Sequence, residues 1–248
     1  MIINTRPDGR ADNELRPLII TPDYTKYAEG SVLICCGNTK VICTASVENK
    51  VPHWLLDEHN NPRHGWITAE YGMLPRSTGS RRNRETATIQ GRTHEIQRLI
   101  GRSLRSATNL HSLESHTIWI DCDVIQADGG TRTASITGGF VALIYALRKM
   151  HDKGDIKEFP VKEFLAAISV GIVNQQPVLD LNYDEDKDAE VDMNVVMLGS
   201  GKLVEVQGTA EGRTYSRKQL NIMLNLAEQG ILSHIDSQKK VLGNNLAG

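Results

Sequence analysis

The residues of this 248-residue chain that are best suited to chemistry lie in the three segments 76–105, 128–133 and 180–192. The first segment holds eight arginines, two glutamates and no lysine, which gives it a net charge of +6. The third holds seven acids and one lysine, a net charge of −6. The total of −2 therefore hides a region suited to anions and a region suited to a cation or a proton.

The arginines of segment 76–105 favour a nucleic-acid ligand. A guanidinium group binds phosphate oxygens through paired N–H donors, whereas an ammonium group acts as a point charge. Arginines in a Gly/Ser loop are well suited to hold a phosphodiester backbone. A solvated surface, or ion pairs with the acidic segment, remains the alternative for the arginines on the helix that follows. The loop arginines expected to bind nucleic acid are Arg76, Arg81, Arg82 and Arg84.

Segment 128–133, Asp-Gly-Gly-Thr-Arg-Thr, lies between an expected strand and an expected helix. Paired glycines let the backbone approach a ligand closely, and the first free N–H groups of a helix attract an anion. Thr131 adds a hydroxyl donor and Arg132 adds positive charge. We therefore expect Gly130, Thr131 and Arg132 to bind one phosphate ion, with an ordinary capped turn as the alternative. The Gly-Ser-Gly segment at 199–201 is expected to be a hairpin turn instead.

Two carboxylates of the acidic segment, Asp186 and Asp192, lie six residues apart, across the end of a loop and the start of a strand. Such a pair can hold Mg²⁺ through oxygen atoms and leave coordination positions for water and a substrate phosphate. One of them can instead act as a general acid toward a leaving hydroxyl group. A solvated acidic turn is the alternative, and it is the expectation for the other acids of the segment.

Hydrophobic periodicity predicts the elements that must position these groups. Ile96, Leu99, Ile100 and Ala107 share one face of a helix, and a second helix spans about 133–150. The last helices begin near Ser216, where Ser216 and Gln219 fit a capping box. This order predicts an α+β fold with two similar halves in one domain, 1–248. The expected strands are 31–36, 39–47, 117–125, 164–173, 177–183, 191–198 and 202–207.

Composition excludes several classes of protein. Hydrophobic residues make up 40% and charged residues 23%, so the chain is not disordered or collagen-like. No apolar run is long enough to span a membrane, and residues 1–8 lack the pattern of a signal peptide. The four cysteines form no CxxC pair and suit reduced core thiols, so we expect a cytoplasmic protein. The histidines of the loop at 52–65 lack metal-ligand spacing.

Nine segments resemble the bacterial ribonuclease PH family, in the family's order and from about residue 6 to residue 230. Segment 65–75 reads Gly-Trp-Ile-Thr-Ala-Glu-Tyr-Gly-Met-Leu-Pro, and segment 121–135 contains the paired glycines described above. Long motifs in a fixed order make chance similarity negligible. The segments are 6–10, 28–33, 43–47, 65–75, 91–93, 95–102, 121–135, 192–197 and 205–211.

The resemblance implies a ribonuclease PH-type fold and a phosphate-dependent 3′→5′ exoribonuclease that trims the 3′ ends of tRNA precursors. It implies a tRNA nucleotidyltransferase that also runs in reverse, dependence on Mg²⁺, and a homohexameric ring built as a trimer of dimers. Inorganic phosphate is expected at Arg92 and at 130–132, and Asp186 and Asp192 form the expected acidic pair. Whether ribosomal RNA is also a substrate stays open.

Two departures and two alternatives accompany this expectation. Compared with the family, loop 55–65 is longer, and the arginine loop is about two residues shorter with Ile89 where a Gly-Lys pair is common. A non-catalytic RNA-binding ring subunit is one alternative, which would lack the phosphate site or the acidic pair. A nuclease that uses water is the other, and the phosphate motif speaks against it.

Overall fold

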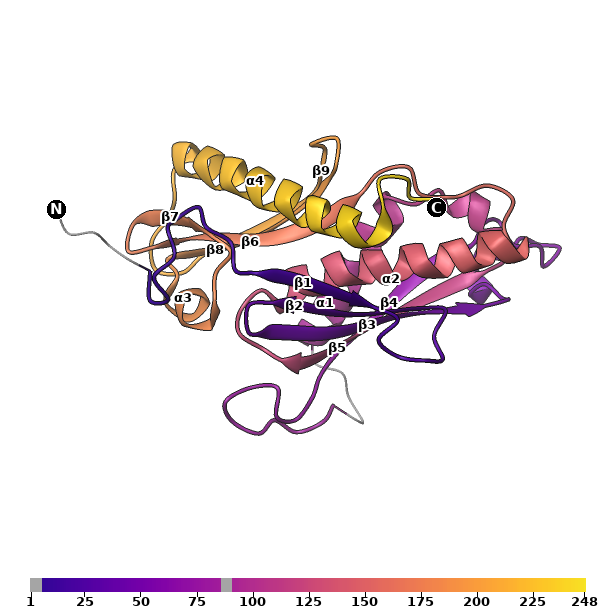
Figure 1. The fold of residues 1–248 in the computed structure, drawn as a ribbon, viewed down its shortest axis with the longest axis horizontal. Coiled ribbons are helices and arrows are strands. Elements are labelled where there is room, and N and C mark those ends of the chain that lie inside the picture. The colour runs from indigo at the N-terminus through magenta and orange to yellow at the C-terminus, as the bar shows by residue number, and fades with distance from the viewer. Residues whose placement is uncertain (1–5, 86–90) are drawn as a thin grey trace.

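Two β-sheets and the helices packed on them form the computed structural model, which describes residues 6–85 and 91–248 (Figure 1). The first sheet has the strand order β1-β2-β3-β5-β4, and the second has the order β7-β6-β8-β9. Strands β4 and β5 run parallel, and the other pairs of neighbours are antiparallel. The strands are Leu18–Pro22 (β1), Gly30–Cys36 (β2), Thr39–Glu48 (β3), Trp66–Met73 (β4), Thr117–Gln126 (β5), Leu165–Val173 (β6), Gln176–Leu179 (β7), Val191–Leu198 (β8) and Leu203–Ala210 (β9).

The last helix of the chain is α4, a single helix where the sequence predicts more than one. The predicted capping box is confirmed, because the Ser216 hydroxyl accepts from the Gln219 backbone and the Gln219 side chain accepts from the Ser216 backbone. Two short 3₁₀ helices precede β4 and β5. The helices are His53–Leu55 (η1), Gly91–Ser106 (α1), Leu110–Leu113 (η2), Thr131–Lys153 (α2), Tyr183–Asp188 (α3) and Arg217–Leu242 (α4).

Helix α2 lies between the two sheets and contacts β2 and β3 on one side and β6 on the other (Figure 1). Fifteen of its 23 residues are buried, as expected for a helix that is apolar around most of its surface. Gly138 permits the close approach, because a Cβ atom there would lie 2.7 Å from Ile34 and 2.9 Å from Cys43. Because α2 packs closely on the first sheet, the N-terminus of α2 has a fixed position relative to that sheet.

Strand β5 shows the predicted alternation. Ile118, Ile120, Cys122 and Val124 are buried on the face that meets α2. Strand β6 is buried along nearly its whole length because α2 covers one face and α4 the other. One cluster of buried apolar side chains extends across both sheets. The α+β expectation is confirmed, and the assignment of 1–248 to a single domain stays a prediction.

Three local expectations differ from the structure. Strands β1 and β4 are not predicted by the sequence pattern, and both lie at an edge of the first sheet. The predicted strand 177–183 is wrong beyond Leu179, because Asp180 adopts a left-handed φ of 55° that ends the strand. The expected acidic loop that follows contains α3, which is capped by Asn182 and Glu185.

Two stretches named in the sequence analysis lie outside the described residues. They are 1–5, part of the N-terminal segment that lacks a signal-peptide pattern, and 86–90, the part of the arginine loop that contains Ile89. Among the helices of the described residues, none has the length and apolarity that crossing a membrane requires.

Candidate active site

The turn between β5 and α2 has the conformation that the paired glycines predict. Gly129 and Gly130 have φ values of 75° and 66°, which strongly favour glycine. A Cβ atom on Gly129 would lie 2.5 Å from the carbonyl oxygen of Leu181, so only glycine fits. Gly130 is the N-cap of α2 and supplies no side-chain cap. Because α2 begins at Thr131, two residues before the predicted start, Thr131 and Arg132 belong to its first turn.

Tyr71 on β4 is a member of the site that sequence reasoning missed. Its hydroxyl lies 2.9 Å from the Thr131 hydroxyl. Burial raises the pKa of Tyr71, while the charges of Arg92 and Arg132 oppose this rise. The phenol is therefore neutral and can hydrogen-bond near the helix N-terminus. The only sequence signal was its position in the 65–75 motif, because the contact with α2 depends on how β4 pairs with β5.

Arg132 is held by a chain of polar contacts from two other elements. Its Nη2 atom lies 3.2 Å from Oε2 of Glu95 on α1. The other oxygen of Glu95 accepts a 2.7 Å hydrogen bond from Gln207 on β9. The Nε atom of Arg132 is buried and has no hydrogen-bond partner among the described residues. Such a donor suits an anionic ligand, because an unpaired buried donor is costly.

Asp186 on α3 and Asp192 on β8 form the acidic side of the site. Both are partly buried. Burial raises the pKa of Asp186. Burial, followed by the charge of Asp186, raises the pKa of Asp192 to about 6. The two carboxylates thus interact with each other, and their surroundings disfavour two negative charges. Such a pair is suited to take up a proton or a cation.

The predicted phosphate-binding and acidic residues come together. The charges of Arg92 and Arg132 lower the pKa of both Asp186 and Asp192, against the effect of burial. Arg92 lies in the first turn of α1, and Arg132 in the first turn of α2. Two guanidinium groups, a helix N-terminus and two carboxylates therefore share one region. This arrangement can place an anionic nucleophile beside an acid.

Two acids that the sequence analysis assigned to a solvated surface, Asp180 and Glu185, are instead 1% exposed. Asp180 accepts hydrogen bonds of 2.6 and 3.0 Å from the Arg16 guanidinium. Glu185 accepts bonds of 2.6 and 2.7 Å from Arg6, and Arg10 adds a further contact at 3.3 Å. The expectation was wrong because the partners come from the N-terminal segment, far away in sequence.

The arginine loop shares a cavity with Arg92 and Tyr71, but neither the turn before α2 nor the two aspartates line this cavity. A cavity of about 540 Å³ is lined by Arg82 and Arg84 from the loop, by Arg92 from α1 and by Tyr71. Arg76 and Arg81 are exposed, and they donate within the loop to Gly79 and Asn83 at 3.0 and 3.2 Å. Arg84 is exposed as well, whereas Arg82 is partly buried and its Nη2 atom lies 3.8 Å from Oε1 of Glu85.

The arginines of the α1 face are divided among three surroundings. Arg98 is exposed. Arg102 forms an ion pair of 2.7 Å with Glu205 on β9. Arg105 donates to the carbonyl oxygen of Ile67 and lies 4.4 Å from the centre of the Trp66 ring. Of these three, Arg98 has the solvated surroundings that the sequence analysis gave as the alternative, whereas the partners of Arg102 and Arg105 lie outside the acidic segment 180–192.

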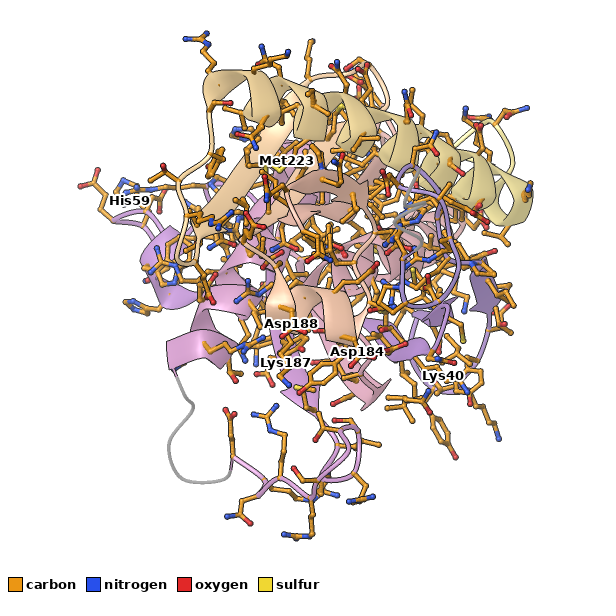
Figure 2. The ribbon with its side chains drawn as sticks, turned by 90° about the vertical axis from the view of Figure 1, so that its left-hand side faces the viewer. Lys40, His59, Asp184, Lys187, Asp188 and Met223 are labelled. Carbon is orange, nitrogen blue, oxygen red and sulfur yellow. The ribbon has the colours of Figure 1, made fainter. Side chains whose placement is uncertain are left out.

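Asp184, Lys187 and Asp188 are exposed side chains of α3, and Figure 2 shows them on the face turned to the viewer, with loop 76–85 projecting below. His59 projects from a different edge of the molecule.

Within residues 6–85 and 91–248, no group of three or more His, Cys, Asp or Glu side chains is arranged to hold a metal ion. That Asp186 and Asp192 supply the oxygen ligands for a cation at the site stays a prediction.

Comparison with known proteins agrees with the resemblance stated above. The family model described as "3′ exoribonuclease family, domain 1" matches residues 14–148, and that of domain 2 matches residues 163–230. Ribonuclease PH of Bacillus subtilis (strain 168) is 59% identical over 244 residues, which cover 97% of this chain and 98% of that protein. Ribonuclease PH of Moorella thermoacetica is 58% identical over 241 residues, 96% of this chain and 95% of that protein.

Solved structures share the fold. Rice (Oryza sativa) Rrp46 has a TM-score of 0.74 at 21% identity, over 96% of this chain and all of that chain. The Archaeoglobus fulgidus exosome with RNA bound to the active site has a TM-score of 0.76 at 21% identity, over 94% of this chain and 92% of that chain. With near-complete coverage at high identity and two consecutive domain matches, the chain belongs to the ribonuclease PH family of 3′ exoribonucleases.

Proposed function

We propose that this phosphate-dependent 3′→5′ exoribonuclease holds inorganic phosphate at Arg92, Gly130, Thr131 and Arg132, and protonates its leaving group from the acidic side of the site. The observation that carries the proposal is the meeting of two guanidinium groups and the α2 N-terminus with two half-buried carboxylates. The substrate is the 3′ end of a tRNA precursor, as family membership implies. The enzyme is thus a tRNA nucleotidyltransferase.

The reaction requires one anion to attack another. An oxygen of inorganic phosphate bonds to the phosphorus of the last phosphodiester, and the bond from that phosphorus to the preceding 3′-oxygen breaks. Arg92, Arg132 and the backbone N–H groups at the start of α2 offset the repulsion between the two anions. The products are a nucleoside diphosphate and an RNA shortened by one nucleotide. Since the bonds broken and formed are similar, the reverse reaction adds nucleotides.

The departing 3′-oxygen needs a proton, and Asp186 and Asp192 lie on the acidic side of the site. In the absence of a bound cation, their raised pKa values keep a proton on the pair at higher pH than a solvated aspartate would. No covalent enzyme intermediate is required. Thr131, whose hydroxyl lies 2.9 Å from that of Tyr71, orients the phosphate from the first turn of α2.

The donor set also fits Mg²⁺. Magnesium sites in phosphoryl-transfer enzymes use one or two carboxylates and complete their coordination with water and substrate phosphates. Asp186 and Asp192 provide two such carboxylates, next to the region in which we place phosphate. When bound there, Mg²⁺ supplies positive charge that offsets the negative charge of the scissile phosphate.

The arginine loop binds the RNA body. Arg76, Arg81 and Arg84 are exposed and Arg82 is partly buried, and Arg82 and Arg84 line the 540 Å³ cavity together with Arg92. We infer that the chain forms a homohexameric ring, a trimer of dimers, in which several copies of the loop hold one RNA with an avidity that a single copy lacks. Its four free cysteines, three of them buried, suit a reducing cytoplasm.

Incubation with Mg²⁺ and a 3′-labelled tRNA precursor, with and without inorganic phosphate, tests the function. Release of labelled nucleoside diphosphate only in the presence of phosphate is the expected result. Release of nucleoside monophosphate without phosphate would contradict phosphorolysis and favour the hydrolytic nuclease. RNA binding without any release would favour the non-catalytic ring subunit. Sedimentation of the same preparation measures the hexamer, and a dimer as the largest species would contradict the ring.

A further inference from the structure

The carbonyl groups of the turn that precedes α2 accept hydrogen bonds from two buried side chains, those of Arg16 and Thr39. Nη1 of Arg16 donates to the carbonyl oxygen of Asp128. The hydroxyl of Thr39 donates to the carbonyl oxygen of Gly129 at 2.6 Å and accepts from the Asp128 backbone N–H at 3.0 Å. Two consecutive peptide groups are therefore held in one orientation.

This orientation determines where the N–H groups point. In a trans peptide the N–H and C=O bonds point in opposite directions across the plane. The carbonyl oxygens of Asp128 and Gly129 point toward Arg16 and Thr39. The N–H groups of the same two peptides, those of Gly129 and Gly130, therefore point away from these side chains. No hydrogen bond joins the N–H of Gly130 to an acceptor in the described part of the chain. Successive N–H groups in such a turn form a concave anion site.

Thr39 and Arg16 are both buried. Thr39 is fully buried at the start of β3. Arg16 is 6% exposed, and its backbone N–H, Nε and Nη2 all donate to the Asp180 carboxylate, at 2.8, 3.0 and 2.6 Å. The backbone of Asp180 is fixed in turn, because its N–H donates to the carbonyl oxygen of Ser169 at 2.8 Å. The turn thus rests on a buried, rigid support.

We propose that Thr39 and Arg16 are positioning residues for inorganic phosphate, acting through the peptide groups of Asp128, Gly129 and Gly130. The inference rests on the proposed function, because it assumes that phosphate binds at this turn. Neither side chain needs to touch the substrate. Rigid placement of donors before binding lowers the cost of binding, so loss of the support weakens phosphate binding more than RNA binding.

The test compares Thr39→Val with Thr39→Ser. Valine has nearly the shape of threonine but cannot donate to Gly129 or accept from Asp128, whereas serine keeps the hydroxyl. Steady-state kinetics on a tRNA precursor give the KM for phosphate and the KM for RNA separately. We expect Thr39→Val to raise the KM for phosphate about tenfold or more, equivalent to about 1.4 kcal/mol or more. The KM for RNA should change by less than about twofold, and Thr39→Ser should restore the KM for phosphate.

Thr117→Val is the matched control. Thr117 is also a buried threonine at the start of a strand, and its hydroxyl donates to the carbonyl oxygen of Lys50 at 2.6 Å. It lies at the opposite end of β5 from the turn. This variant should lose a similar amount of thermal stability and keep the wild-type KM for phosphate.

The outcomes are distinct. A wild type that releases nucleotides without phosphate would overturn the proposed function and the inference together. A phosphate-dependent wild type with an unchanged KM for phosphate in Thr39→Val would overturn the inference alone, as would an equal rise in Thr117→Val.

If Thr39→Val does not fold, Arg16→Lys takes its place, because one ammonium group cannot bridge Asp180 and Asp128 as the guanidinium does. A KM for phosphate in Arg16→Lys within about twofold of wild type would then overturn it.

Discussion

Asp180 and Glu185 are buried against arginines, whereas Asp186 and Asp192 have no ion-pair partner among the described residues. All four lie within segment 180–192. Burial alone would raise the pKa of Asp180, but the hydrogen bonds and charge of Arg16 hold it below its ordinary value. For Asp186 and Asp192, burial prevails and the pKa rises. The comparison separates acids that support the fold from acids available for chemistry, although the sequence gives both the same charge.

Asp192→Asn should produce the largest effect on activity. It removes a carboxylate that the proposed reaction uses as acid or cation ligand, so phosphate-dependent nucleotide release should fall by about 10²–10⁴-fold. The free energy of unfolding should stay the same or increase slightly, because the neighbouring Asp186 loses a repulsive partner. Product release and urea denaturation measure the two quantities. A strongly destabilised, active variant would place Asp192 among the structural acids instead.

Arg92→Ala tests the anionic side of the same site. Loss of a guanidinium group at the phosphate position should lower kcat/KM by about 10²–10³-fold with the fold retained. Arg98→Ala is the matched control, because Arg98 lies on the same helix and is exposed. Its kcat/KM should stay within about twofold of wild type. Unchanged phosphorolysis in Arg92→Ala would remove Arg92 from the phosphate site.

Asp180→Asn should affect stability. It leaves the guanidinium of Arg16 buried with no anionic partner, and such a change costs about 3–5 kcal/mol. Asp184→Asn, an exposed change on α3, should alter the free energy of unfolding by less than about 0.5 kcal/mol. Urea denaturation at neutral pH and fixed protein concentration compares the two variants. Equal stabilities would show that the buried pair adds nothing to the fold.

The pH dependence of unfolding sharpens the same comparison. A folded-state pKa below the ordinary value of 3.8 means that ionised Asp180 stabilises the fold above that pH. This contribution is lost as the pH falls through the lower folded-state pKa. The free energy of unfolding of Asp180→Asn should therefore depend less on pH in this acidic range than that of Asp184→Asn. Parallel pH profiles for the two variants would contradict the lowered pKa.

The sequence predicted the features that local pattern controls. A glycine pair between a strand and a helix predicts the turn at 128–130, because glycine is the residue type that adopts the required positive φ values without strain. The hairpin at 199–201 and the capping box at Ser216 are local in the same sense. The residues of the turn at 128–130 could thus be predicted from the sequence alone.

The burial of Asp180 and Glu185 could not be predicted in this way. Their arginine partners lie 164 and 179 positions away, and only the packed fold brings them together. Tyr71 was missed for the same reason, since its contact with Thr131 spans 60 positions and two elements. Charge density along the chain identified the acidic segment, but only the three-dimensional contacts distinguish the acids buried against arginines from those without an ion pair among the described residues.

The smallest expected effect concerns the arginine loop, in which Arg84 is exposed to solvent and not buried against an acid. Arg84→Ala removes one exposed guanidinium group that lines the cavity leading to Arg92. Loss of one phosphate contact should weaken RNA binding several-fold and reduce the slope of log K against log salt by about one. Arg63→Ala, an exposed arginine of another loop, should leave this slope unchanged. Equal slopes for both variants would show that RNA does not contact loop 76–85. A reduced slope in Arg84→Ala alone would show that the loop binds the RNA backbone, a role distinct from that of the residues proposed to hold inorganic phosphate.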